Sequence, residues 1–257
     1  MMGGIAYETF LLGRRSFLRW ARVPGNWIST LFFPLIQLLI FSQLFKDIIQ
    51  LPGFKESSYL AYLAPGQIVF AVFLGVSWTG INLLMDYHNG FLDKLRVTPI
   101  HRISILFGEM VPLFFTSAAM AGVILITSLV LGATLVTGIL GGIGILVLSG
   151  LFAMAWAGTS FVPALITKNE QAAGTLSLLF FPLAFMSTAF VPAERMPDWL
   201  RVVNDWNPIS YVIEAQRSLM STGFDAGLIG KALVAMAILG LVTQLATIWA
   251  FRRLTTA

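Results

Sequence analysis

The chain has 257 residues, of which 57% are apolar and only 11% are charged. Soluble domains carry about 25% charged residues, so this composition excludes a water-soluble globular protein, and it contains too much apolar surface to remain disordered. The absence of cysteine excludes a disulfide framework and thiolate chemistry. The net charge of +4 is too small and too dispersed to indicate nucleic-acid binding. The chain is therefore expected to lie mostly in lipid.

Uncharged stretches of about 20 residues predict six transmembrane helices, because such a stretch crosses a hydrocarbon core of about 30 Å at about 1.5 Å per residue. One stretch, 110–167, is too long for a single crossing and is rich in glycine in its middle, so we divide it near 132–138. The expected spans are 23–45, 57–85, 110–132, 138–167, 171–193 and 232–251, and the helix of the last is expected to begin near Leu228. Open sheets leave backbone groups unpaired in lipid, so the predicted fold class is an all-α polytopic membrane protein.

Residues 1–24, ahead of the first span, are expected to form an amphipathic helix in the cytoplasmic interface. One face carries Glu8, Arg15, Arg19 and Arg22, and apolar residues cover the other. Two interpretations stay open. The helix is either a passive anchor held by anionic lipid or a lever that also contacts a cytoplasmic partner.

The segment 86–102 follows the second span and alternates charged and apolar residues at helical spacing. Thr98-Pro99 is expected to end this short helix, because a residue before proline avoids the α region. Such a helix between two long spans suits docking to another protein, although an ordinary positively charged loop would have the same composition. His88 and His101 are expected to be polar loop residues and not metal ligands, since no further ligands lie at zinc-like spacing.

The segment 191–227 is expected to form a pair of short helices on the outer side. Asn207-Pro208 predicts a helix start, because asparagine caps helices and proline suits the first position. The helix that follows has about 13 residues and a length of roughly 20 Å, too short to cross. Glu214 and Arg217 stand three residues apart and are expected to pair, which lowers the cost of partial burial. The segment is thus either re-entrant or an interfacial hairpin.

The positions of Lys and Arg predict the orientation. With the N-terminus inside, ten of them fall in the inner segments and six in the outer segments. Because cytoplasmic loops carry an excess of these residues, both termini are expected in the cytoplasm.

Sequence patterns of the common enzyme sites are absent. The sequence contains no Gly-x-x-x-x-Gly-Lys-Ser/Thr loop for nucleotide phosphates, no His-Glu-x-x-His and no Gly-x-Ser-x-Gly. We therefore expect no enzymatic activity, no metal and no bound cofactor.

Several stretches together resemble the membrane subunit of type-2 ABC exporters, especially the daunorubicin-resistance-like permeases of bacteria. They are Asp93-Lys-Leu-Arg-Val-Thr-Pro-Ile-His-Arg102, Lys168-Asn-Glu-Gln171, Val191-Pro, Met196-Pro-Asp-Trp-Leu200 and Asn207-Pro-Ile-Ser-Tyr-Val-Ile-Glu-Ala-Gln-Arg217. The resemblance covers nearly the whole chain, and the last stretch is the most distinctive. Gln216 departs from it, since a small or apolar residue is commoner there.

The resemblance implies one transmembrane domain, 1–257, with a connecting helix (1–24), a coupling helix (86–102) and an outer re-entrant segment (191–227). It also implies a permease dimer, homomeric or heteromeric, served by two separate ATPase subunits that bind ATP and Mg²⁺. The implied ATPase-coupling residues are Leu92, Asp93, Lys94, Leu95, Arg96, Thr98, Pro99, His101, Arg102, Lys168 and Glu170. Those of the outer re-entrant helix are Asn207, Pro208, Tyr211, Glu214 and Arg217.

In that arrangement the substrate pathway follows the dimer interface along the first, second and fifth spans. Its candidate residues are Phe33, Gln37, Phe41, Trp78, Asn82, Phe181 and Phe185. Amides inside a span are unfavourable unless they pair or face a cavity, so Gln37 and Asn82 either line the pathway or bond between helices. Pro34 and Pro182 are expected to kink their spans.

The expected function is ATP-driven export of a hydrophobic drug-like or lipid substrate across a bacterial cytoplasmic membrane. A lipid-linked glycan is the alternative substrate. An ion-coupled secondary transporter would need an acidic or basic residue inside the membrane, and only Glu109 comes close to that position.

Overall fold

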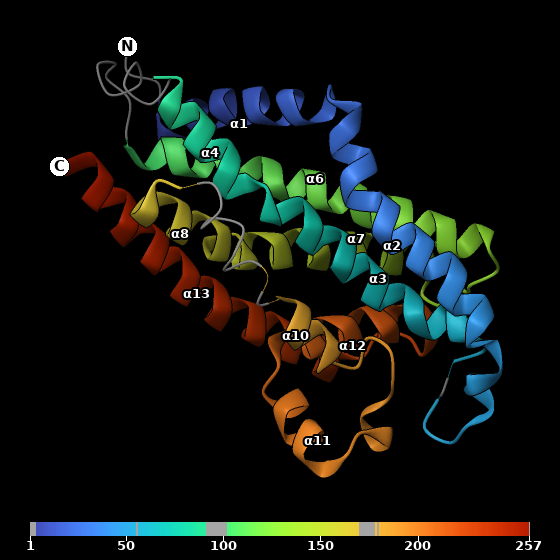
Figure 1. The fold of residues 1–257 in the computed structure, drawn as a ribbon. Helices are drawn as coiled ribbons and strands as arrows, with labels where there is room; N and C mark the ends of the chain where they lie inside the picture. Colours follow the sequence, from blue (N-terminus) through green and yellow to red (C-terminus); the bar gives the residue numbers. More distant parts are fainter. Residues whose placement is uncertain (1–3, 55, 91–101, 170–177, 179, 257) are drawn as a thin grey trace.

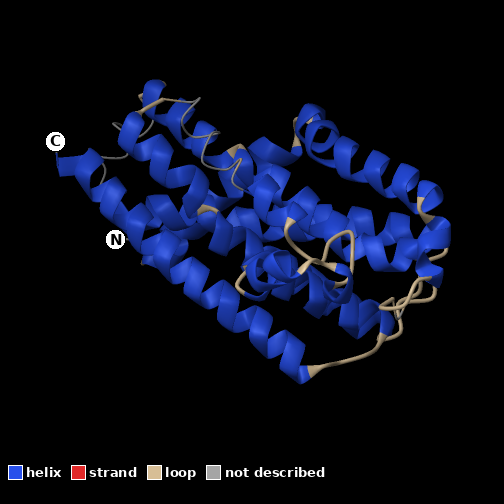
Figure 2. Ribbon diagram, turned by 60° about the horizontal axis from the view of Figure 1, so that its bottom comes forward, coloured by secondary structure: helices blue, strands red, loops and turns tan. Residues whose placement is uncertain are grey.

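The computed structural model describes residues 4–54, 56–90, 102–169, 178 and 180–256, in which helices are the only regular secondary structure (Figures 1 and 2). The first half contains α1 (Ile5–Ala21), α2 (Pro24–Leu44), the short η1 (Lys46–Gln50), α3 (Tyr59–Ser77), α4 (Thr79–His88) and α6 (Arg102–Val130). The second half contains α7 (Gly138–Trp156), α8 (Gly158–Thr167), α10 (Phe180–Phe185), η2 (Ala193–Arg195), α11 (Asp198–Asp205), α12 (Pro208–Ser221) and α13 (Ala226–Thr256). The predicted all-α class is confirmed.

Five stretches of the described residues are long and apolar enough to cross a membrane. They are Pro24–Leu44, Tyr59–Asp86, Phe107–Val130, Gly138–Thr167 and Ala226–Arg252. These five correspond to expected spans, so the polytopic character is confirmed. The remaining expected span, the fifth (171–193), includes residues 171–177 and 179, which lie outside the described residues. Its described remainder contains α10.

The centre of the bundle is α3, which packs against α2, α6, α7 and α12. Its residues from Tyr59 to Phe73 are buried without interruption. A helix that is apolar on all sides is typical of a buried helix or a membrane span, and α3 has both properties. By contrast, only 11% of the α13 span is buried, so α13 lies on the outside.

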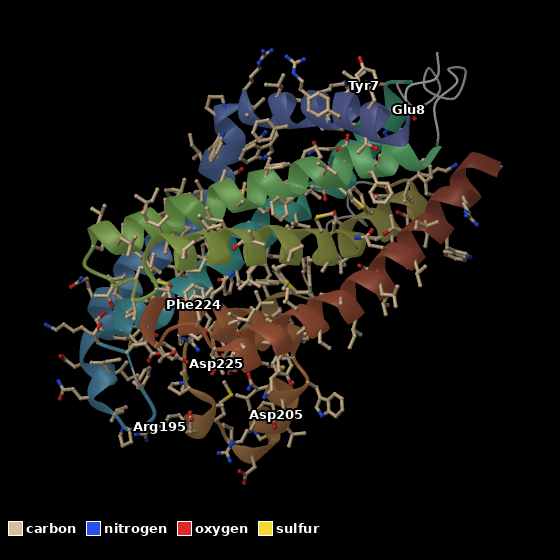
Figure 3. The ribbon with its side chains drawn as sticks, turned by 180° about the vertical axis from the view of Figure 1, so that it is seen from behind. Tyr7, Glu8, Arg195, Asp205, Phe224 and Asp225 are labelled. Carbon is tan, nitrogen blue, oxygen red and sulfur yellow. The ribbon has the colours of Figure 1, made fainter. Side chains whose placement is uncertain are left out.

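The two ends of the bundle carry different elements. The helix α1 lies across the end where the last turns of α13 are found, and α11 lies at the opposite end (Figure 1). Figure 3 labels Tyr7 and Glu8 at the first end and Arg195 and Asp205 at the second. Regions that the sequence places on the two sides of the membrane are thus separated in space.

The helices α4 and α8 cross in close contact. A Cβ atom on Gly80 would lie only 2.2 Å from the backbone oxygen of Ser160. The Ser160 hydroxyl accepts from the Gly80 amide at 3.0 Å and donates to the Ser77 carbonyl at 3.1 Å. Glycine is required here because any side chain would separate the helices and break these bonds.

Candidate functional site

The charged face of α1 is turned toward α4 and α6. Arg15 and Arg19 donate to the buried carboxylate of Asp86 in α4, at 3.1 and 2.7 Å. The side chain of Arg19 also lies 3.7 Å from Glu109 in α6, and the Ser16 hydroxyl donates to Glu109 at 2.6 Å. Arg15 and Arg19 are one helical turn apart, so both reach the same carboxylate.

A second contact ties the start of α1 to α6, because the Ser104 hydroxyl donates to Glu8 at 2.7 Å. We call Glu8, Arg15, Arg19, Asp86 and Glu109 the α1 charge cluster. Buried carboxylates are unfavourable without charged or hydrogen-bonding partners. The two arginines supply charged partners to Asp86 and Glu109, and the Ser104 hydroxyl supplies a hydrogen bond to Glu8.

Other residues of α1 lie outside the cluster. Arg22, expected on the same face, follows the end of α1 and is exposed. The apolar residues Tyr7 and Phe10 are 60% and 63% exposed. The apolar face of α1 thus lies on the outside of the chain, and most of its charged residues lie on the face that contacts the bundle.

The corner between α1 and α2 is held by two tryptophans. The rings of Trp20 and Trp27 lie 4.4 Å apart, and the side chain of Asn26 donates to the Trp20 carbonyl at 3.1 Å. These contacts join the start of α2 to the end of α1.

A cavity of about 310 Å³ adjoins the cluster. Its lining includes Arg19, Trp20, Asn82, Asp86 and Glu109. Asn82, expected in the substrate pathway, therefore faces a polar cavity beside α1.

The connection between α4 and α6 is shorter than the expected segment 86–102. The helix α4 continues to His88, and Arg102 is already the first residue of α6. Asp86 lies within α4, where it pairs with Arg15 and Arg19, so the loop begins later than expected. The coupling residues from Leu92 to His101 lie outside the described residues, as does Glu170. Lys168 is exposed and ends α8 in the left-handed conformation.

The other expected pathway residues are aromatic side chains that are exposed or partly buried in this chain. Phe33, Trp78 and Phe185 are 48%, 52% and 58% exposed. Phe41 and Phe185 both contact Phe190, with ring centroids 6.2 and 5.4 Å apart.

Two buried amides lie in neighbouring helices, α2 and α3. Gln37 is buried in α2, and its side-chain oxygen has no hydrogen-bond partner among the described residues. Gln67 in α3 is fully buried and has no such partner for either side-chain atom. Gln67 was not among the pathway residues expected from the sequence. The signal that selected Gln37, an amide side chain within a span, applies equally to Gln67.

The outer helix α12 begins as expected. Asn207 accepts from the Ile209 amide at 3.0 Å, and its side-chain nitrogen donates to the Leu183 carbonyl at 2.6 Å. Pro208 is the first residue of the helix. The Tyr211 hydroxyl donates to the Asp205 carbonyl. These bonds connect α12 to the end of α11 and to α10.

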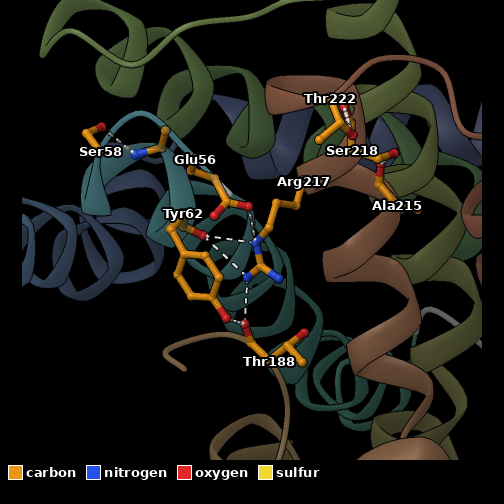
Figure 4. Close-up of polar contacts among 9 residues, drawn as sticks. Glu56, Ser58, Tyr62, Thr188, Ala215, Arg217, Ser218 and Thr222 are labelled. Carbon is orange, nitrogen blue, oxygen red and sulfur yellow. Dashed lines mark hydrogen bonds and ion pairs between the residues drawn. The ribbon is translucent and has the colours of Figure 1, made fainter. Parts of the chain in front are cut away.

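Arg217 anchors α12 to the centre of the bundle, but not through the expected partner. Its guanidinium donates to the carbonyls of Thr188 and Tyr62, at 2.5 and 3.3 Å (Figure 4). It lies 3.8 Å from the centre of the Tyr62 ring and 3.9 Å from the carboxylate of Glu56. The ion pair of Arg217 is thus with Glu56 and not with Glu214. Burial raises the pKa of Glu214, and the charge of Arg217 opposes that shift.

Residues 7–221 match the sequence profile of the ABC-2 type transporter family. The chain belongs to this family. It is 31% identical over 223 residues to the daunorubicin resistance ABC transporter permease protein DrrB1 of Streptomyces coeruleorubidus, an alignment that covers 84% of this chain and 76% of the relative. It is 30% identical over 253 residues to the protein named ycf38 of Cyanophora paradoxa, covering 91% and 86%. It is 24% identical over 216 residues to DrrC of Mycobacterium tuberculosis, whose name refers to doxorubicin resistance, covering 84% and 78%.

The expected resemblance is thereby confirmed, and the chain is a multi-pass membrane permease of the ABC type. Membership of this family implies an ATPase partner. The matched region runs from α1 to the last residue of α12, so it contains both the α1 charge cluster and the Arg217 anchor.

Proposed function

We propose that the permease exports a hydrophobic drug-like or lipid substrate, driven by ATP that a separate subunit hydrolyses. The observation that carries this proposal is the match over residues 7–221 together with a relative named for daunorubicin resistance. The sequence has no Gly-x-x-x-x-Gly-Lys-Ser/Thr loop, which agrees with ATP and Mg²⁺ bound on the partner. The chain then does no covalent chemistry itself.

In this proposal the segment 89–101 docks onto the ATPase and passes its movement to the spans. The segment joins α4 to α6, and both helices are bound to α1 through the charge cluster. A displacement of the segment would therefore move α1, and the Trp20–Trp27 contact would carry it to α2. Nucleotide shifts the balance between two states of the spans because each state binds the closed ATPase differently.

The assembly in this proposal contains two permease chains and two ATPase subunits in a bacterial cytoplasmic membrane, with both termini in the cytoplasm. Substrate would pass between the permeases near α2, α3 and the fifth span. Gln37 and Gln67 support this placement, because buried amides without partners are unfavourable and gain bonds if an opened state exposes them to water or substrate.

The chain gives less support to a secondary transporter. Its candidate coupling acid, Glu109, is held by Ser16 and Arg19 at the edge of the bundle, so it is not a free proton site on a pathway. A lipid-linked glycan remains the alternative substrate class within ATP-driven export.

Transport by inverted membrane vesicles tests the proposal. Vesicles that contain the permease and its ATPase should accumulate daunorubicin, used as the probe, when ATP and Mg²⁺ are supplied. Vesicles with a hydrolysis-deficient ATPase are the matched control. Accumulation that needs a proton gradient but not ATP would support the secondary transporter instead, and transport of a lipid-linked glycan but no hydrophobic probe would support the alternative substrate.

A further inference from the structure

A groove of about 680 Å³ lies between α13 and the connection from α11 to α12. Apolar side chains of α13 form most of one wall. They are Val234, Ala235, Ile238, Leu239 and Val242. The polar lining comes from Asp205, Tyr211 and Lys231. The exposed Trp206, the partly buried Pro208 and Gly230 complete the lining.

The apolar wall of the groove is about as long as one membrane leaflet is deep. The uncharged part of α13 lies between Lys231 and Arg252, and its length is about 30 Å, which matches the hydrocarbon core. From Lys231 to Val242 the helix rises about 16 Å, or roughly half of that core. Since only 11% of this span is buried within the chain, the groove opens on a face of α13 that the chain itself leaves uncovered.

The polar lining carries one charge of each sign. Asp205 and Lys231 are both exposed, and neither forms an ion pair with another residue in the described part of the chain. Trp206 is 84% exposed, as expected for an indole at the level of lipid headgroups. A headgroup with a phosphate and an ammonium would satisfy both side chains at once.

We propose that this groove binds a zwitterionic amino phospholipid. One acyl chain lies along α13, the phosphate contacts Lys231, and the ammonium contacts Asp205. The site does not depend on ATP or on the transported substrate, so its test is separate from that of the proposed function.

Native mass spectrometry of the purified permease tests the site, with phosphatidylethanolamine and phosphatidylglycerol of identical chains as probes. The change Ile238→Trp fills the groove. Leu241→Trp is the control, because Leu241 is 63% exposed on the same helix and does not line the groove. Ile238→Trp should weaken phosphatidylethanolamine binding by about tenfold or more, since the acyl chain loses its apolar contact, while the control should bind as the wild type does.

The charged residues give a second test that does not alter packing. Lys231→Gln should weaken binding of both lipids, whereas Asp205→Asn should remove only the preference for phosphatidylethanolamine over phosphatidylglycerol. Lys46→Gln, at another exposed lysine, should change neither. Equal binding by the two tryptophan variants, or no preference between the lipids in the wild type, would overturn the proposal. A third result would also overturn it: the wild-type permease carries no bound lipid and is a dimer, and Ile238→Trp makes it a monomer. In that case a second copy of the chain, and not a lipid, would cover the groove.

Discussion

Asp86 is the residue on which the α1 charge cluster depends, because it is buried and bonded to two arginines. The side chains of Arg15 and Arg19 are 40% and 36% exposed, so water can hydrate them if Asp86 is removed. The side chain of Asp86 is only 7% exposed, so its charge depends more on the arginines. Removing the arginines should therefore be worse than removing the carboxylate.

The double change Arg15→Gln with Arg19→Gln should lower the free energy of unfolding by about 3–5 kcal/mol, since it leaves a buried carboxylate without its charged partners. Asp86→Asn alone should lower the free energy of unfolding by clearly less. Combining Asp86→Asn with the double change should restore part of the stability that the double change removes. Thermal unfolding in detergent measures all three. If Asp86→Asn is as harmful as the double change, the carboxylate is not the critical buried charge.

Arg217 makes bonds that lysine cannot replace, because a planar guanidinium reaches two carbonyls and stacks on the Tyr62 ring at the same time. We expect Arg217→Lys to reduce both stability and transport. A double-mutant cycle for Arg217 should give a coupling energy of about 0.5–3 kcal/mol with Glu56 and a smaller one with Glu214. A larger coupling energy with Glu214 would show that Arg217 pairs with Glu214, as their spacing in the sequence predicted. Arg22→Gln, at an exposed arginine outside the α1 charge cluster, is the control.

At the scale of helices, the contact between α1 and α6 rests on a glycine. A Cβ atom on Gly108 would lie 2.6 Å from the Cβ atom of Leu12, so no side chain fits without moving α1. Gly108→Ala should loosen α1 and reduce ATP-driven transport, because the charge cluster can no longer form with its present geometry. Gly122→Ala in the same helix is the control, since its nearest neighbour would be 3.6 Å away. Equal transport by the two variants would show that close packing of α1 is not needed.

The sequence located helices well where their signal is local and poorly where it depends on tertiary contacts. Uncharged stretches identified α2, α3, α6, α7 and α13 because lipid excludes charge from a span. The ends of α4 and α6 were misplaced because Asp86 and Arg102 are charged and yet helical.

The sequence also could not predict which residues pair with the buried charges. Spacing along one helix suggested that Arg217 pairs with Glu214, but Glu56 is brought to it from a distant part of the chain by the packing of α12 against α3. Asp86 and Arg19 are likewise 67 residues apart, so only the fold reveals their contact.

For the whole molecule, orientation can be tested with cysteines, because the natural chain has none. Cysteines at Ser57 and Thr222 should react with an impermeant thiol reagent added to intact cells. Those at Asn89 and Asn169 should react only after the membrane is opened. Labelling of Asn89→Cys in intact cells would reverse the proposed orientation.

The central claim is that this permease is driven by a separate ATPase that docks on the segment between α4 and α6. Substrate-stimulated ATP hydrolysis by the complex in nanodiscs measures it most directly. Burying a leucine contributes about 1.5–3 kcal/mol, so Leu95→Ala should weaken assembly about tenfold or more, and stimulation should fall with it. Arg96→Glu should reduce stimulation further than Arg96→Ala, while all variants remain inserted with unchanged orientation. Wild-type stimulation in both Leu95→Ala and Arg96→Glu would contradict the claim.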